Sequence, residues 1–237
     1  MANEPALLSV LVPVWNGAAF LAEALDSVRK DVTGPFEIVV VDDGSTDDTA
    51  AIARGFDVPL RYDLQAHAGL AVARNRLIEL ARGELIAFLD ADDRWPRGRV
   101  SILERALAEH PECGLSQGRL QRLVRVDGAD EFTLVDESWA APSVCTALIR
   151  RDVFERVGGF DTAFPNGHDV DWLLRARELG VAFSGVDAVT LHYRRHEHNM
   201  TNDIAVDQPA LLRVLARAVA RRRNAAGSPS RSARNDA

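Results

Sequence analysis

Short apolar stretches alternate with amphipathic segments along the first half of the chain. The stretches are rich in Val, Leu and Ile, which is typical of strands that are buried on both faces of a sheet. We expect strands at residues 8–12, 38–41, 60–63 and 85–89. Because strands and helices that alternate in this way form parallel sheets, the pattern predicts an α/β fold with a mostly parallel sheet flanked by helices.

The segments between these strands have apolar residues at helical spacing. Three helices are expected, and they begin near residues 16, 45 and 70. Asn16 is a suitable N-cap for the first helix, and Ser45 with Asp48 resembles the capping box of the second. In sheets of this kind ligands bind at the carboxyl ends of the strands, so the loops that follow the strands are the first place to look for function.

The pattern changes after residue 110. Two apolar runs flank residues 127–130 and predict a hairpin. Further elements are expected as strands at 143–149 and 189–193 and as helices at 152–157 and 170–179. We interpret residues 1–223 as a single domain, in which 7–110 and a smaller region, 111–205, form two halves.

The C-terminal stretch has a composition of its own. Residues 208–223 predict a helix with five arginines on its polar side, and the Ser-, Ala-, Arg- and Gly-rich residues 224–237 are expected to be disordered. The basic helix is either a solvated outer face or a contact with an acidic lipid surface.

Composition excludes several classes of protein. Apolar residues make up 47% of the chain and charged residues 27%, which is typical of a globular domain. The net charge of -7 argues against a protein whose main task is to cover nucleic-acid phosphates. No signal peptide or apolar run of about 20 residues is present, so we expect a cytoplasmic protein without a transmembrane segment. Cys113 and Cys145 lack a paired spacing and are expected to be free thiols.

Carboxylates follow three of the predicted strands. They form two close groups, and Asp63 stands alone; the groups are Asp42–Asp43 and Asp90, Asp92 and Asp93. Carboxylates packed this closely repel one another unless a cation or hydrogen-bond donors intervene, so the second group predicts a site for Mg²⁺ or Mn²⁺. The alternatives are that Asp92–Asp93 caps the helix after Pro96, and that Asp42–Asp43 is a turn and helix cap instead of a contact for a nucleobase or ribose.

The usual nucleotide-binding motifs are absent from the sequence. No G-x-G-x-x-G follows a predicted strand and no G-x-x-x-x-G-K-[ST] occurs. A dinucleotide-dependent dehydrogenase and a P-loop enzyme are therefore disfavoured.

Five motifs in a fixed order make the sequence resemble family 2 glycosyltransferases over about residues 7–200. They are VLVPVWN at 10–16, VVVDDGST at 39–46, ARN at 73–75, FLDADD at 88–93, and GGFD at 158–161 followed by HDVD at 168–171. The resemblance implies a GT-A type fold, a nucleotide-sugar donor, most often a UDP-sugar, a divalent metal, and inversion at the anomeric carbon.

The same resemblance implies roles for individual residues. The residues that correspond to the nucleotide-sugar site are Pro13, Val14, Asn16, Asp42, Asp43, Arg74, Asp90, Ala91 and Asp92. Asp92, together with Asp90 or Asp93, corresponds to the metal site. His196, in a stretch similar to the family's Tyr-Arg-x-His, corresponds to a contact for the metal or the diphosphate, although a lone His is more often a surface residue.

Asp169 corresponds to the catalytic base, with N-capping of the following helix as the alternative. The family usually has Glu-Asp at this position, and here the pair is His168–Asp169. A histidine at this position is able to change the acceptor pocket or the pKa of the base.

These inferences predict an enzyme that transfers a single sugar to an acceptor hydroxyl of a glycan, a lipid carrier, a peptide or a small molecule. The chain lacks the Gln-x-x-Arg-Trp motif and the membrane helices of processive synthases. The first alternative is a catalytically inactive protein that binds a nucleotide sugar. The second, a nucleotidyltransferase, requires a glycine-rich basic loop after the first strand, and the sequence there is PVWNG.

Overall fold

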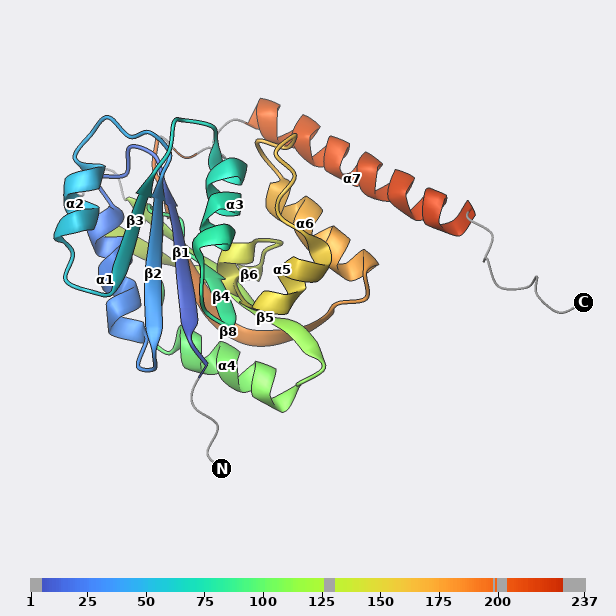
Figure 1. Ribbon diagram of the computed structural model, residues 1–237, viewed down its shortest axis with the longest axis horizontal. Coiled ribbons are helices and arrows are strands. Elements are labelled where there is room, and N and C mark those ends of the chain that lie inside the picture. The colour runs from blue at the N-terminus through green and yellow to red at the C-terminus, as the bar shows by residue number, and fades with distance from the viewer. Residues whose placement is uncertain (1–5, 126–130, 198, 200–203, 228–237) are drawn as a thin grey trace, which may run out of the picture.

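The computed structural model describes residues 6–125, 131–197, 199 and 204–227. Its centre is one eight-stranded mixed sheet in the order β3-β2-β1-β4-β7-β5-β6, in which β8 pairs with β5 (Figure 1). The strands are β1 (Leu8–Val14), β2 (Phe36–Asp42), β3 (Leu60–Leu64), β4 (Leu85–Phe88), β5 (Cys113–Arg125), β6 (Phe132–Ala140), β7 (Ala147–Arg150) and β8 (Ala182–Arg195). Strands β1 to β4 are mutually parallel, so the predicted α/β fold is confirmed.

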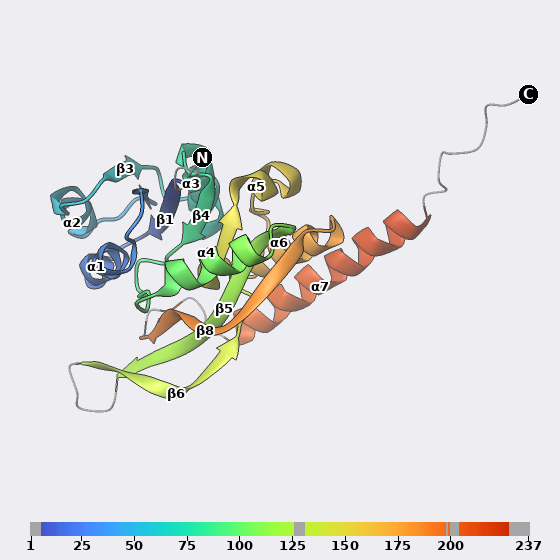
Figure 2. The same cartoon turned by 90° about the horizontal axis from the view of Figure 1, so that it is seen from below.

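Helices connect the strands and cover the sheet. They are α1 (Leu21–Asp31), α2 (Thr49–Gly55), α3 (Leu70–Leu80), α4 (Arg99–Glu109), α5 (Arg151–Val157), α6 (His168–Glu178) and α7 (Ile204–Gly227), with a short 3-10 turn η1 (Val144–Thr146) before β7. Helices α1 and α2 lie at one end of the molecule and α7 lies at the other (Figure 1). Helix α4 packs on β5 and β8 (Figure 2). No helix in the described part of the chain is long and apolar enough to cross a membrane.

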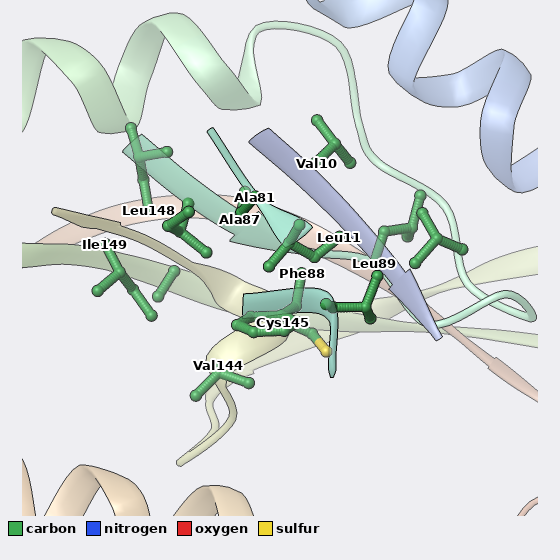
Figure 3. Packing of buried hydrophobic residues seen from close by; sticks show 14 of the residues in the cluster. Val10, Leu11, Ala81, Ala87, Phe88, Leu89, Val144, Cys145, Leu148 and Ile149 are labelled. Carbon is green, nitrogen blue, oxygen red and sulfur yellow. The ribbon is translucent and has the colours of Figure 1, made fainter. Parts of the chain in front are cut away.

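Apolar side chains of β1 and β4 meet those of η1 and β7 in the core. Figure 3 shows Phe88 of β4 beside Cys145 of η1, with Leu11 and Leu148 nearby. Phe88 also packs edge-on against Phe160, with ring centroids 5.6 Å apart. This core therefore joins the parallel strands to the segment that precedes α6, and it fixes α6 near the end of β4.

Both predicted helix caps in the first half are wrong. Helix α1 begins at Leu21 and α2 at Thr49. Asn16 has a positive φ of 51°, and its side chain accepts a hydrogen bond from the Thr46 backbone N–H at 2.8 Å. The Ser45 hydroxyl accepts from the Asn16 backbone N–H at 2.8 Å. These side chains bridge two loops instead of capping the helix that follows each of them.

Several boundaries in the second half also differ from the predictions. Strand β8 is longer than the predicted 189–193 because it pairs along most of β5. The predicted strand at 143–149 begins with the turn η1. The two arms of the predicted hairpin pair as β5 and β6, whereas its turn at 127–130 lies outside the described residues. Helix α7 continues to Gly227, so the first residues of the predicted disordered tail are helical, and 228–237 are not described.

Candidate functional site

The loops after β1 and β2 are tied together by side chains. Besides the two bonds that bridge Asn16 to Ser45 and Thr46, the Ala18 backbone N–H donates to Asp47 at 3.0 Å. Strand β1 ends with Pro13 and Val14, and the Val14 carbonyl accepts from the Asp43 backbone N–H at 2.8 Å. The carboxyl ends of these two strands therefore form one rigid edge of the sheet.

Asp42 is buried at this edge and bonded to neutral donors. Its carboxylate accepts from the Ser45 backbone N–H at 2.8 Å and from the Tyr62 hydroxyl at 2.7 Å. Burial, followed by the hydrogen bond and charge of Asp42, raises the pKa of Tyr62 to about 12. Tyr62 therefore remains a proton donor to Asp42 at neutral pH.

Asp43 is bonded to the segment that leads into α3. Its carboxylate accepts from the Ala68 and Gly69 backbone N–H groups at 2.9 and 2.8 Å and from the Gln65 amide at 2.7 Å. Gly69 is the N-cap residue of α3, so Asp43 supplies negative charge at the N-terminus of that helix. The sequence left open whether this pair serves as a cap, and in the structure Asp43 caps α3, not the helix that directly follows it.

An exposed aromatic surface lies beside Asp43. The Trp15 and His67 rings are stacked with centroids 4.5 Å apart, and the indole is 56% exposed. His67 Nδ1 lies 2.9 Å from the Asp43 carboxylate. Trp15, His67 and Gln65 could not be assigned a role from the sequence, because each is an isolated residue in a loop. Such a surface is suited to stacking with a planar ring.

One guanidinium joins the end of β4 to the start of α6. Arg74 of α3 is only 1% exposed. Its Nη2 donates to Asp90 at 2.8 Å, and its Nη1 donates to Asp169 at 2.9 Å. Both carboxylates are part of the predicted site, so the structure brings these three residues together, with Arg74 in the protein interior between the two acids.

Arg74 also determines the charge state of Asp169. Burial raises the pKa of Asp169, but the charge of Arg74, then the adjacent His168 and the hydrogen bond from the Ser143 hydroxyl, at 3.1 Å, outweigh burial and hold the pKa below its usual value. Asp169 is therefore ionised at neutral pH, as a proton acceptor must be. Ser143 was missed by the sequence analysis because it lies on a different segment of the chain.

His168 lies behind this group of side chains and is buried. Arg74 Nη1 is 2.8 Å from His168 Nε2, and an arginine has no acceptor, so Nε2 must accept. The proton is then on Nδ1, which lies 3.3 Å from the Pro165 carbonyl. Burial, together with the charge of Arg74, outweighs the opposing charge of Asp169 and lowers the pKa of His168. The residue is therefore a neutral acceptor at neutral pH, and it does not displace Asp169 from Arg74.

Asp92 follows β4, and its side chain is 31% exposed, about as much as that of Asp90 at 30%. Its Oδ2 lies 3.0 Å from His196 Nε2 and 3.3 Å from Asn199 Nδ2. The His196 ring also packs on Phe20, with centroids 4.7 Å apart, which places it beside the loop after β1. Asp92 and His196 supply one oxygen and one nitrogen donor at an accessible point of the site.

Asp90 and Asp93 have other partners. Asp90 is bonded to Arg74, and Asp93 is buried and accepts from the Arg194 backbone N–H at 2.9 Å. Burial, and then the charges of Asp92 and Asp90, raise the pKa of Asp93 well above its usual value. Among the described residues no group of three or more His, Cys, Asp or Glu side chains is arranged to hold a metal ion.

The donor set still fits a divalent ion. Mg²⁺ is commonly bound by one or two carboxylates together with the phosphates of a substrate, without a complete protein cage. Asp92, with the imidazole of His196 beside it, meets that requirement. Ala91 is buried next to these residues, where a Cβ added at Gly17 would lie 3.4 Å from the Ala91 Cβ.

The sequence matches known glycosyltransferases. The profile of glycosyl transferase family 2 matches residues 9–158. A PGL/p-HBAD biosynthesis glycosyltransferase of Mycobacterium bovis is 31% identical over 177 residues, which cover 71% of this chain and 69% of that protein. The putative teichuronic acid biosynthesis glycosyltransferase TuaG of Bacillus subtilis is 33% identical over 118 residues, and these cover 46% of each chain. The match thus spans about half the length of TuaG.

Solved structures show the same fold. S. aureus TarS 1-349 in complex with UDP-GlcNAc superposes with a TM-score of 0.74 at 20% identity, covering 90% of this chain and 65% of that one. The mannosyltransferase PcManGT of Pyrobaculum calidifontis, in complex with GDP-Man and Mn2+, gives a TM-score of 0.72 at 22% identity, covering 91% and 64%. The predicted GT-A type fold is therefore confirmed.

Proposed function

Because this chain belongs to glycosyl transferase family 2, we propose that it transfers a single sugar from a nucleotide-diphosphate sugar to an acceptor hydroxyl with inversion at the anomeric carbon. The observation that supports this most directly is the position of Arg74. One buried guanidinium holds Asp90, at the end of the strand that precedes Asp92, and Asp169, the candidate base, at 2.8 and 2.9 Å. The donor side and the proton acceptor thus have a fixed spatial relation, which a displacement reaction requires.

The donor nucleotide is proposed to bind at the joined ends of β1 and β2. The residues proposed to contact it are Pro13 and Val14 at the end of β1, Asn16 in the loop that follows, and Asp42 and Asp43 at the end of β2. The exposed stack of Trp15 on His67 is suited to packing against the base. We propose a UDP-sugar as donor, which agrees with the UDP-GlcNAc in the TarS complex, while the PcManGT complex contains GDP-Man.

Asp169 is the proposed general base. Its ionised carboxylate takes the proton of the acceptor hydroxyl as that oxygen attacks the anomeric carbon. The bond from the anomeric carbon to the diphosphate breaks, and the nucleoside diphosphate departs with the bonding electrons. Arg74 and the Ser143 hydroxyl hold the carboxylate in place. Because the attack occurs opposite the leaving group, the configuration inverts.

Asp92 and His196 are the proposed ligands for Mn²⁺ or Mg²⁺. A bound divalent ion would offset the negative charge that grows on the departing diphosphate. Asp90 and Asp93 were also expected to bind the metal, but the hydrogen bonds from Arg74 and Arg194 engage their carboxylates. We therefore assign the main contribution to Asp92.

The acceptor is proposed to bind in a cavity of about 800 Å³ beside α6. Val170, which lines this cavity, directly follows Asp169, and Pro142, which also lines it, directly precedes Ser143. The cavity wall comes from residues 117–119, 140–142 and 183–187, from Val170, Leu173, Leu174 and Arg177 of α6, and from Arg222, and most of it belongs to the predicted acceptor-side half.

The variant Asp169→Asn tests the proposed base. We expect transfer to fall by about 10²–10⁴-fold, because the amide accepts no proton, while donor binding persists. Transfer is measured as nucleoside diphosphate released in the presence of a panel of glycan, lipid-linked, peptide and small-molecule acceptors. Binding is measured as the rise in melting temperature with nucleotide sugar and Mn²⁺.

Ser143→Ala is the matched control, since it removes a donor to Asp169 and retains the base. A smaller loss of transfer is expected for this variant. Full transfer by Asp169→Asn would contradict the assignment of the base. Donor binding by the unsubstituted protein without turnover on any acceptor would instead favour the catalytically inactive alternative.

A further inference from the structure

Helix α7 has one face buried on the body of the protein. Ala210, Val214 and Ala218 are buried at four-residue spacing, and a Cβ added at Gly167, before α6, would lie 3.3 Å from Val214 Cγ2. Helix α7 runs along α6 and continues past its end in both views (Figures 1 and 2). The small residues on this face permit close packing.

Ion pairs determine how α7 is rotated about its axis. Arg221 donates to Asp171 at 2.9 Å and to Glu178 at 2.7 Å. Arg217 pairs with Asp161 at 2.9 Å. Because these contacts and the buried small residues lie on the same side of the helix, the opposite side faces away from the protein.

That outward side has a stripe of large apolar side chains, which we call the apolar stripe of α7. Its members and their exposed fractions are Leu211 (44%), Leu212 (67%), Leu215 (43%) and Val219 (48%). In a monomer with an ordinary surface, single exposed leucines need no explanation. Four within nine residues on one side of a helix form a contiguous patch, and such a patch marks an interaction surface.

The positive charge of α7 indicates which kind of partner binds the apolar stripe. Residues 209–224 contain five arginines and no Asp or Glu, although the whole chain has a net charge of -7. Arg213 and Arg223 form no ion pair with the described side chains. A second copy of α7 would bring like charges together, whereas an anionic surface would be attracted to them.

We propose that α7 docks the protein onto an anionic lipid surface, with the apolar stripe inserted among the lipids and with Arg213 and Arg223, which form no ion pair with the described side chains, at the headgroups. A helix with an apolar face and a basic polar face lies in the plane of the membrane interface. Arg222 of α7 also lines the cavity beside α6, so docking would bring that cavity to the membrane. A lipid-borne acceptor follows only if the proposed function is correct; the docking itself does not depend on it.

The experiment is co-sedimentation of the full chain with two kinds of vesicle, phosphatidylcholine alone and phosphatidylcholine mixed with phosphatidylglycerol. We expect binding to the mixed vesicles only, and we expect it to weaken as salt is added. The double variant Leu212→Glu with Leu215→Glu should abolish binding. The double variant Arg213→Gln with Arg223→Gln should weaken it about 30-fold, which corresponds to about 1 kcal/mol for each basic residue near an anionic surface.

Leu64→Glu is the control, because Leu64 at the end of β3 is 58% exposed and lies on a different element. It should bind as the unsubstituted protein does. Circular dichroism melting of each variant confirms that the outward substitutions leave the fold intact. The proposal is wrong if the protein ignores anionic vesicles, if Leu64→Glu loses binding equally, or if ultracentrifugation shows a dimer that the Leu212→Glu, Leu215→Glu variant dissociates.

Discussion

The acidic residues at the ends of β2 and β4 look alike in sequence but have different surroundings in the structure. Asp42 and Asp43 are buried and accept hydrogen bonds from backbone N–H groups, a tyrosine and a glutamine. At the end of β4, Asp90 is bonded to the guanidinium of Arg74 and Asp93 to a backbone N–H, while Asp92 is partly exposed beside His196.

The difference concerns how each group of charges is compensated. Backbone and side-chain dipoles stabilise the first pair without any added ion, so its position is fixed before a ligand binds. In the second group the guanidinium of Arg74 pairs with Asp90, and also with Asp169 of α6, whereas Asp92 has only the imidazole of His196 and the amide of Asn199 beside it. We infer that Asp42 and Asp43 mainly hold the loops of the nucleotide site in place. The second group, with Asp169, carries the charges that metal binding and proton transfer require.

The largest effect is expected from Arg74→Leu, which breaks the second group. Asp90 and Asp169 would lose their shared cation, and removal of one partner from a buried ion pair typically costs about 3–5 kcal/mol. We expect a loss of that order in the free energy of unfolding in urea, together with a loss of transfer. Arg76→Leu is the matched control, because Arg76 lies on the same helix but is exposed. If both variants unfolded at the same urea concentration, the central role of Arg74 would be refuted.

The same Asp→Asn substitution in each of the two acidic groups should have different effects, both smaller than that of Arg74→Leu. Asp43→Asn should lower the free energy of unfolding by about 1–3 kcal/mol, because the new amide N–H₂ faces backbone donors. Asp92→Asn should leave that free energy almost unchanged and should remove the Mn²⁺-dependent part of the melting-temperature rise with nucleotides. Thermal melts with and without Mn²⁺ separate the two results. An unchanged Mn²⁺-dependent rise in Asp92→Asn would exclude it as a metal ligand.

The sequence predicted the local features of this arrangement well. Apolar runs determined β1 to β4, and the acids at their ends could be identified by position alone. The contacts of Arg74 could not be predicted, since His168 and Asp169 are 94 and 95 positions away and meet it only after α6 packs near β4. The caps failed for a related reason: Asn16 and Ser45 are good local caps, but each bonds across 29 or 30 positions to the other loop.

The smallest expected effect concerns His168 and the pH dependence of stability. Burial lowers the pKa of His168 in the folded protein, whereas in the unfolded chain its pKa is near 6.5. As pH falls, His168 is therefore protonated in the unfolded chain before it is protonated in the folded protein. The free energy of unfolding therefore falls as pH drops below 6.5, with a slope of up to about 1.4 kcal/mol per pH unit. His168→Gln should flatten this slope, because glutamine takes up no proton in either state, and its side-chain oxygen still accepts from Arg74.

A second histidine must be removed to isolate this effect. Burial, and then the charge of Arg94, lower the pKa of His192 to about 4. Protonation of His192 on unfolding therefore also lowers the free energy of unfolding as pH falls. Urea unfolding of His192→Gln and of the double variant, compared between about pH 7 and pH 5, leaves His168 as the difference between them. Equal slopes would mean that His168 takes up its proton as readily in the folded protein as in the unfolded chain. In that case Arg74 would not require a neutral imidazole beside it, and the assigned tautomer of His168 would be wrong.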